Sequence, residues 1–176
     1  APQVTAMTTA QAGALSADQL TALGVSAFGA LNRYHIEALS TTTISELDTS
    51  VIRSLSNTQI ASFTTSQLGA LSDEQVKSVT SSQFNAFNVT NFTKLSGSQL
   101  QAIDVSTFSA ISPSLIGYLT KDQVSLLTVN QVAGMTTAQI RTLDQDKLDS
   151  MTSDQANALT AAQKAAILVE GRKVPG

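Results

Sequence analysis

The 176-residue sequence has no cysteine, no tryptophan and a single histidine, His35. Without cysteine the chain has no disulfide, no thiolate nucleophile and no zinc–cysteine site. A catalytic or metal-binding role for His35 would need ionisable partners at defined reach, and neither a second histidine nor a cysteine is there to serve. We find no set of nucleophile, base and orienting group, and therefore expect no enzyme activity, no cofactor and no metal.

Charge is also scarce, because only 13% of residues are charged and the formal net charge is −3. Acidic and basic residues are mixed along the chain, so it lacks the basic stripe that is typical of nucleic-acid binding. No apolar run approaches the roughly 18 residues that a membrane span needs. No charged and then apolar signal segment begins the sequence, which says little about compartment because a mature or excised chain would lack one.

What the chain does have is an apolar residue at every eighth position from Leu15 to Ile167. Counted in blocks of eight from Thr8, the sequence divides into twenty complete octads without insertion or deletion. A partial unit, Ala1–Met7, precedes them. Self-similarity at a fixed period predicts a repeat architecture.

Octad position 1 is Ser, Thr, Asp or Asn in every unit except the one that begins at Gly24. These residues are the favoured helix N-caps, and Asp104 is one example. Position 4 is Gln in twelve of the twenty units, and Gln3 holds the same place in the partial unit. Ser or Thr followed three residues later by Gln is the capping box, so the pattern predicts a helix start in each octad. We interpret His35, which is at position 4, as a substitute capping residue.

Positions 5 and 8 are the apolar positions, and a spacing of three places both on one face of a helical turn. At position 5 the side chains become smaller or polar toward the ends of the array, at Ala12, Ala156 and Lys164. Position 7 is small in sixteen units, which indicates close backbone approach. Positions 2, 3 and 6 hold most of the charge and are expected to face solvent.

Geometry excludes the other regular architectures. In one continuous helix eight residues advance by about 800°, so the apolar stripe would rotate by roughly 80° per repeat. A coiled coil needs a period of about seven or eleven. In a β-solenoid, positions 5 and 8 would point to opposite faces. We therefore expect an all-α solenoid or superhelix of about twenty very short helices, one per octad, with a shared apolar interior.

We expect this α-solenoid to form a single repeat domain over residues 1–167. Residues 168–176 depart from the octad pattern and include Gly171, Arg172, Lys173 and Pro175. We interpret them as a C-terminal tail or the start of a linker. The alternative is that the array was cut from a longer protein, as the incomplete first unit suggests.

Polar and aromatic clusters have simpler explanations than a binding site. Asp144, Asp146 and Asp149 lack the glycine turn and closing glutamate of a calcium loop, and Asp144 is explained as an N-cap. Asn88 and Asn91 each begin a match to the N-glycosylation pattern. They stand at octad positions 1 and 4, respectively, so the repeat already accounts for both residues.

Aromatic residues of the octad pattern, such as Phe84, Phe87 and Phe92, occupy positions 5 and 8 and are expected to fill the core. Tyr118 and Leu126 are different, because they replace the small residue at position 7 in consecutive units. Such a change indicates a local packing change, a bend or an exposed apolar patch. These two residues are our candidate partner surface.

Blocks such as Thr64–Leu71 and Thr136–Leu143 resemble the short tandem repeats of large secreted bacterial surface and adhesin-type proteins. They are similar, more distantly, to the superhelical repeats of the mesothelin and stereocilin group. The resemblance implies an extracellular or cell-surface spacer or presenting rod without catalytic residues. The alternative is a solenoid module that binds a protein or glycan partner at the cell surface. The oligomeric state is not indicated by the sequence.

Overall fold

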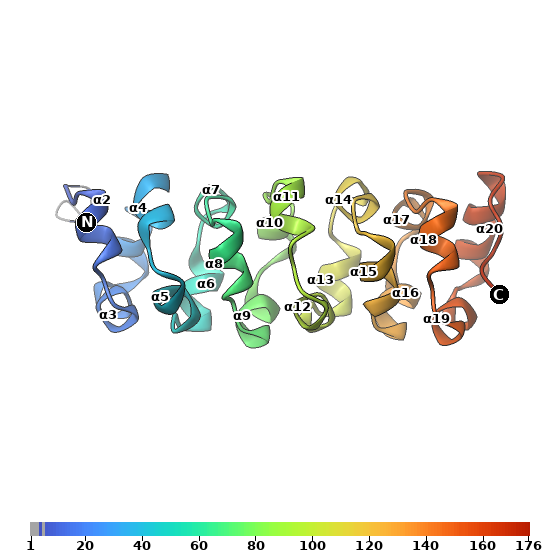
Figure 1. Cartoon of the computed structure of the whole chain (residues 1–176), viewed down its shortest axis with the longest axis horizontal. Helices are drawn as coiled ribbons and strands as arrows, with labels where there is room; N and C mark the ends of the chain where they lie inside the picture. The colour runs from blue at the N-terminus through green and yellow to red at the C-terminus, as the bar shows by residue number, and fades with distance from the viewer. Residues whose placement is uncertain (1–3, 5) are drawn as a thin grey trace. The chain divides into compact units, whose positions relative to one another are not determined.

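The computed structural model describes residue 4 and residues 6–176, and for residues 25–27 it describes the backbone only. Gln3 therefore lies outside the described residues. Across the described part of the chain all regular structure is helical, in nineteen short helices, which confirms the predicted all-α, solenoid-like class (Figure 1). No helix in that part is both long and apolar enough to cross a membrane.

The chain forms two compact units, Ala1–Lys94 and Leu95–Gly176. The helices described in the first unit are α2 Thr9–Gly13, α3 Ala17–Phe28, α4 Arg33–Ala38, α5 Thr41–Ser45, α6 Thr49–Ser54, α7 Asn57–Ala61, α8 Thr65–Gly69, α9 Asp73–Ser78, α10 Ser81–Phe84 and α11 Val89–Phe92. Those of the second unit are α12 Gly97–Ala102, α13 Val105–Ser109, α14 Pro113–Gly117, α15 Lys121–Leu126, α16 Val129–Gly134, α17 Thr137–Arg141, α18 Gln145–Asp149, α19 Ser153–Ala158 and α20 Ala161–Val169.

Each octad forms one helix, and the residue at position 1 is its N-cap. In α8, for example, the hydroxyl of Thr64 accepts a hydrogen bond from the backbone N–H of Gln67. The exception is α3, which spans two octads and contains Gly24 with a φ of 75° and a ψ of 166°. Glycine adopts this conformation without a side-chain penalty. The prediction that the side chain of Asp104 caps its helix is wrong, because Asp104 precedes α13 but makes no side-chain capping bond.

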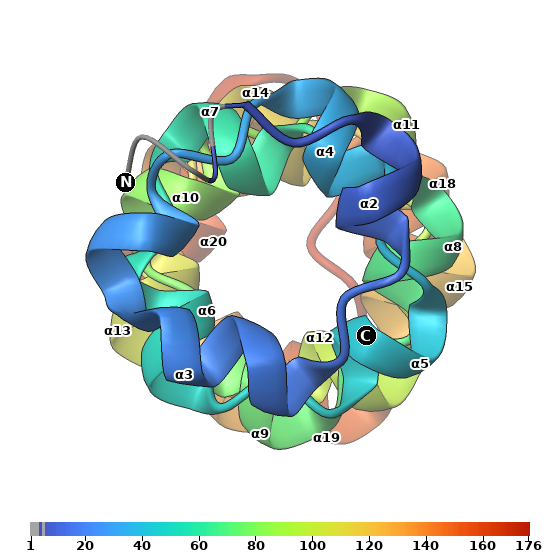
Figure 2. The same ribbon diagram turned by 90° about the vertical axis from the view of Figure 1, so that its left-hand side faces the viewer.

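Within each unit the helices wind into a coil, so that helices three octads apart pack side by side. In the first unit α6 packs on α9, and their first residues, Thr49 and Asp73, are 24 positions apart. In the second unit α13 packs on α16, and α16 packs on α19. Figure 2 shows the helices of the first unit arranged around a common interior.

The predicted apolar positions form that interior. From Ala12 to Ala156 every side chain at position 5 is buried, and Lys164 at the end of the series is half-buried. Position 8 is buried from Leu31 to Ile167, whereas Leu23 is exposed. A helix of five or six residues is unstable alone in water. Each octad is therefore stabilised by burying its two apolar side chains, which contributes about 1.5–3 kcal/mol for each large one.

Close backbone approach at position 7 is confirmed where a glycine lies against the adjacent coil turn. A Cβ at Gly13 would lie 2.8 Å from the backbone oxygen of Ala38, a position 7 residue. A Cβ at Gly117 would lie 2.9 Å from the Cβ of Thr142, also at position 7. The small residues thus let successive coil turns pack closely.

Candidate functional site

The most regular polar feature of the molecule is the side-chain amide at octad position 4. Its oxygen completes the capping box of its own helix, as the sequence predicts. In α8 the Oε1 of Gln67 accepts a hydrogen bond of 2.9 Å from the backbone N–H of Thr64. This bond satisfies one of the backbone donors that a helix start leaves unpaired.

The amide nitrogen of the same side chain has a second, long-range role. The Nε2 of Gln67 donates to the backbone oxygens of Ile36 and Leu39, each at 2.8 Å. These oxygens belong to octad positions 5 and 8, four octads earlier in the chain. Because Gln67 is 2% exposed, its amide would carry an energetic penalty if any of these groups were unpaired.

The same arrangement recurs along both units, and we call it the glutamine ladder. It comprises the position 4 side chains whose nitrogen donates to backbone oxygens 28 and 31 residues earlier. Its members are Gln59, Gln67, Gln75 and Gln83 in the first unit, and Gln131, Gln139, Gln155 and Gln163 in the second. In the described part of the chain, no buried side-chain nitrogen or oxygen lacks a hydrogen-bond partner.

Four other residue types, His, Thr, Asn and Lys, make a long-range bond where glutamine is replaced. His35 is buried, its Nδ1 accepts from the N–H of Asn32 at 3.4 Å, and its Nε2 lies 2.9 Å from the oxygen of Met7. With Nδ1 accepting, Nε2 carries the proton and donates. The role of His35 as a substitute capping residue is thus confirmed, with the second role of a ladder member added.

The two shorter substitutes keep one bond of the pair. The Oγ1 of Thr43 donates to the oxygen of Leu15 at 3.1 Å. The Nδ2 of Asn91 donates to the oxygen of Phe63 at 2.9 Å. Each reaches the carbonyl 28 residues earlier, which is the bond that a short side chain can still make.

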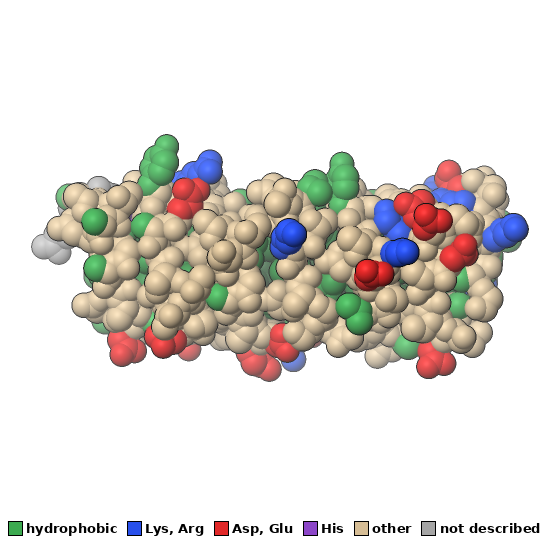
Figure 3. Space-filling view, viewed as in Figure 1, with side chains coloured by type: hydrophobic (Ala, Val, Ile, Leu, Met, Phe, Trp, Pro, Cys, Tyr) green, Lys and Arg blue, Asp and Glu red, His purple; other side chains and the backbone are tan. Residues whose placement is uncertain are grey.

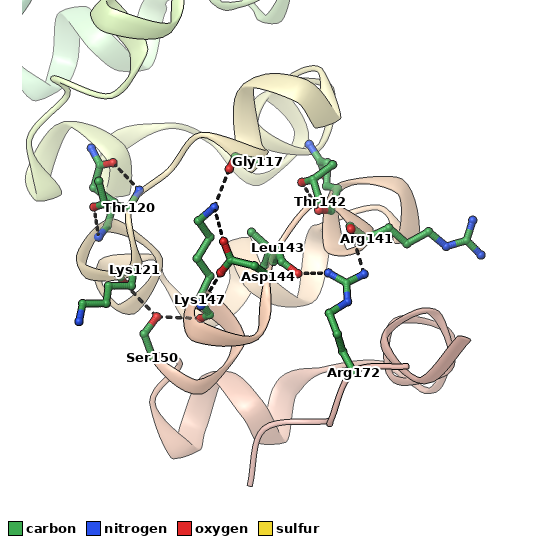
Figure 4. A network of polar contacts seen from close by, with 12 residues as sticks. Gly117, Thr120, Lys121, Arg141, Thr142, Leu143, Asp144, Lys147, Ser150 and Arg172 are labelled. Carbon is green, nitrogen blue, oxygen red and sulfur yellow. Dashed lines mark hydrogen bonds and ion pairs between the residues drawn. The ribbon is translucent and has the colours of Figure 1, made fainter. Parts of the chain in front are cut away.

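A charged version of the ladder lies in the second unit, around α18 (Figure 4). Lys147 is at position 4, and its Nζ donates to the oxygen of Gly117 at 2.8 Å. The same Nζ lies 3.1 Å from Oδ2 of Asp144, the N-cap of α18. The Oδ1 of Asp144 accepts from the backbone N–H of Lys147 at 3.0 Å. Asp144 thus caps its helix and also neutralises the cation that replaces glutamine.

These contacts lower the pKa of Asp144 below its ordinary value. The largest cause is the hydrogen bond from the backbone N–H of Lys147, and the positive charges of Lys147 and Arg172 act in the same direction. The carboxylate form is therefore the one that the folded chain favours.

Arg172 continues the pattern after the last octad. Its guanidinium donates to the backbone oxygens of Leu143 and Arg141, as Figure 4 shows. The backbone of Lys173 exchanges two hydrogen bonds with the side chain of Gln145, at 2.8 Å and 3.2 Å. Residues 168–176 leave the octad pattern, as expected, but part of this segment bonds to the preceding coil turn.

The other acidic and asparagine candidates are placed as follows. Asp149 accepts a hydrogen bond from Gln145, and Asp146 lies in the first turn of α18. Across the described residues, no group of three or more His, Cys, Asp or Glu side chains is arranged to hold a metal ion. Of the glycosylation-pattern asparagines, Asn91 is buried in the ladder and Asn88 is exposed.

The candidate partner residues Tyr118 and Leu126 are exposed by 53% and 45%. Leu126 lies over Gly97, where a Cβ would be 2.8 Å from its Cδ1. The backbone oxygen of Leu126 also accepts from Gln101 at 2.7 Å. In the face that Figure 3 shows, apolar side chains form separate spots among polar surface.

The first unit has a surface hollow of about 450 Å³ on its helices α4 and α7 and at the start of α11. Arg33 lies at this hollow and forms a 2.6 Å ion pair with Glu37. Its lining residues are mostly polar and uncharged or small, namely Asn57, Thr58, Ala61, Ser62, Ala86 and Asn88, in addition to Arg33. The sequence contains no local signal for this hollow, because its lining comes from four octads, 32–39, 56–63, 80–87 and 88–95, that span more than 50 residues of the chain.

Comparison with known proteins supports the assignment of the chain as a tandem repeat. No curated protein matches the chain. Residues 44–81 match the model of a family described as the ALTTAQ repeat. Read as residues, that name corresponds to octad positions 7, 8, 1, 2, 3 and 4, and Ala158–Gln163, outside the matched range, agrees with it at every position except 161. Residues 44–81 are therefore similar to a short tandem-repeat family.

Proposed function

We propose that this chain is a non-enzymatic structural segment, which serves as a spacer or presenting rod in a secreted or cell-surface protein of the adhesin type. The observation that carries the proposal is the glutamine ladder. It uses the polar side chains at position 4 to join coil turns, and leaves the variable positions 2, 3 and 6 to face solvent.

The properties of the ladder suit a spacer. Each long-range bond joins turns of the same coil, so stability accumulates unit by unit, as in other repeat proteins. An array of this kind can be lengthened by adding octads without redesigning its core. The small share of charged residues, 13%, and the absence of cysteine fit a chain that is exported and folds without disulfides.

The hollow of the first unit favours a second candidate function, a protein- or glycan-binding module. Its amides, hydroxyls and guanidinium present both donors and acceptors, which suits a hydroxyl-rich saccharide. A screen of immobilised glycans against the wild-type chain and an Arg33→Ala variant tests this candidate. Binding that the variant loses would favour the module, whereas no binding to any glycan would remove the glycan form of this alternative.

The spacer proposal is tested in native cells with an antibody raised against this chain. Surface, secreted and cytosolic fractions are separated and blotted. We expect a band far above 18.4 kDa, the mass of this chain, in the surface or secreted fraction. A band near that mass in the cytosol would refute the proposal.

A further inference from the structure

The hollow of the first unit combines a single cation with uncharged polar groups. It lies on the side of that unit along which α4, α7 and α10 follow one another (Figure 1). Of its lining residues, all within the described part of the chain, only Arg33 is charged. Small-molecule sites in proteins have volumes of about 300–1,000 Å³. At about 450 Å³, the hollow therefore has the size of a site for a small saccharide.

The guanidinium of Arg33 has one donor occupied and its outer edge available. Its Nε donates to the Oε1 of Glu37 at 2.6 Å. Among the described residues neither Nη nitrogen of Arg33 has a hydrogen-bond partner, and the side chain is 69% exposed. Glu37 itself is not among the lining residues, so the hollow contains no carboxylate. The two Nη nitrogens form the planar pair of N–H donors that binds a carboxylate through both of its oxygens.

The uncharged side chains of the hollow supply hydrogen bonds for hydroxyl groups. The Oδ1 of Asn88 accepts from the backbone N–H of Asn91 at 2.8 Å, and within the described structure its Nδ2 makes no hydrogen bond. The amide of Asn57 bonds to the hydroxyl of Ser82, which lies 3.0 Å from Nδ2 and 3.4 Å from Oδ1. An amide has two N–H donors and an oxygen with two lone pairs, so each of these amides retains a donor. Thr58 adds a hydroxyl, which both donates and accepts.

We propose that this hollow binds a saccharide residue that carries a carboxylate, such as a hexuronic acid or a sialic acid. The carboxylate pairs with the Nη edge of Arg33, and the ring hydroxyls bond to Asn57, Thr58 and Asn88. A neutral sugar would leave that edge of the guanidinium without its ionic partner, and a simple carboxylate would leave the amides unused. The inference rests on the second candidate function, glycan binding, and adds the class of glycan.

Matched probes test the class of ligand by nuclear magnetic resonance titration of the full, isotope-labelled chain. Methyl glucuronide and methyl glucoside share one ring and differ only in a carboxylate that replaces a hydroxymethyl group. The methyl glycoside of N-acetylneuraminic acid is compared with its carboxamide in the same way. Acetate reports what a carboxylate binds without a sugar ring.

We expect at least one of the two acids to bind about tenfold more tightly than its neutral counterpart and than acetate, as for a hydrogen-bonded charge pair. Arg33→Gln should abolish this preference, because it removes the cation. Asn88→Asp keeps an oxygen that can cap α11, but it places a negative charge in the hollow and should weaken binding of the acid. Arg53→Gln is the matched control, because Arg53 is an exposed arginine of the same unit that does not line the hollow. It should leave all the affinities unchanged.

The outcomes separate this inference from the candidate function on which it rests. Equal affinities for the acids and their neutral counterparts overturn the carboxylate class and leave a glycan-binding hollow. Acetate that binds as tightly as the acids overturns the saccharide. A preference for the acid that survives Arg33→Gln overturns the assignment to Arg33. If no probe shifts the resonances of the lining residues, both the inference and the glycan-binding candidate fail, whereas the spacer proposal is unaffected.

Discussion

Gln67 and Leu39 are 28 positions apart in the sequence, yet the Nε2 of Gln67 donates to the backbone oxygen of Leu39 over 2.8 Å. At its other end the same amide group caps helix α8 through Thr64. One uncharged side chain therefore stabilises a helix start and also holds two coil turns together. The capping bond and the long-range bond can therefore be removed in separate variants.

Replacing Gln67 by Glu separates the two halves. Glutamate keeps the capping oxygen, but at neutral pH it places a buried carboxylate against two backbone oxygens. We expect a loss of about 3 kcal/mol or more in the free energy of unfolding, as for a buried charge without a partner. Urea unfolding followed by circular dichroism measures it. The control is Gln19→Glu, which is exposed and should change stability by less than about 0.5 kcal/mol; equal losses would contradict the ladder.

Replacing Leu71 by Asp tests the inward placement of position 8. Leu71 is buried, so an aspartate there puts an unpaired charge into the apolar interior. We expect a destabilisation of more than about 3 kcal/mol, measured by thermal unfolding. Ser66→Asp, on the exposed first turn of the same octad, should be neutral or slightly stabilising. An unchanged midpoint for Leu71→Asp would rule out the burial.

Replacing Thr64 by Ala tests the N-cap, because the hydroxyl of Thr64 accepts from the N–H of Gln67. The expected loss is about 1 kcal/mol in the free energy of unfolding. Asp104, also at octad position 1, makes no side-chain capping bond. Asp104→Ala should therefore cost clearly less, and what it costs should shrink in high salt because only attraction to the helix N-terminus is lost. Similar losses at both sites would argue against side-chain capping.

Gly117 and Gly69 share octad position 6 but differ in their surroundings. A Cβ at Gly69 meets nothing within 4 Å, whereas one at Gly117 would lie 2.9 Å from the Cβ of Thr142. Gly69→Ala should stabilise the chain by about 0.5–1 kcal/mol through helix propensity. Gly117→Ala should lose that gain and destabilise by about 1 kcal/mol because of overpacking. Chemical unfolding of both variants checks the sign, and stabilisation of both would show that the coil turns at Gly117 are not closely packed.

Acid should weaken the contacts around Asp144. Its pKa is lowered in the folded chain, chiefly by the backbone N–H of Lys147. A lowered folded pKa contributes stability above the unfolded value of about 3.9, and this contribution is lost as pH falls through the folded pKa. The thermal midpoint of the wild type should therefore decline below about pH 4. Asp144→Asn, which can still cap α18, should decline less; parallel curves would show that Asp144 does not contribute.

Much of this architecture was predictable because the octad carries local signals. The cap at Thr64, the capping box with Gln67 and the apolar pair Leu68 and Leu71 are set by residues within one unit, and all four are placed as expected. Asp104 is a departure from the pattern, because it makes no side-chain capping bond.

The long-range half of the ladder was missed because its acceptors are backbone oxygens. A backbone oxygen is present at every residue, so no residue type marks Ile36 and Leu39 as the partners of Gln67. One signal was available: capping alone does not require a buried amide, and the glutamines are concentrated at position 4, directly before the apolar position 5. The same limit applies to Arg172, whose partners are also backbone oxygens.

The ladder has a direction that matters for how the chain is made. In every ladder bond the side-chain donor comes later in the sequence than its backbone acceptor, by 28 or 31 residues. During synthesis, each new glutamine therefore leaves the ribosome after the carbonyls that it will bind. Each turn can dock on one that is already complete, so the coil can assemble vectorially from its N-terminal end in the order in which the chain emerges.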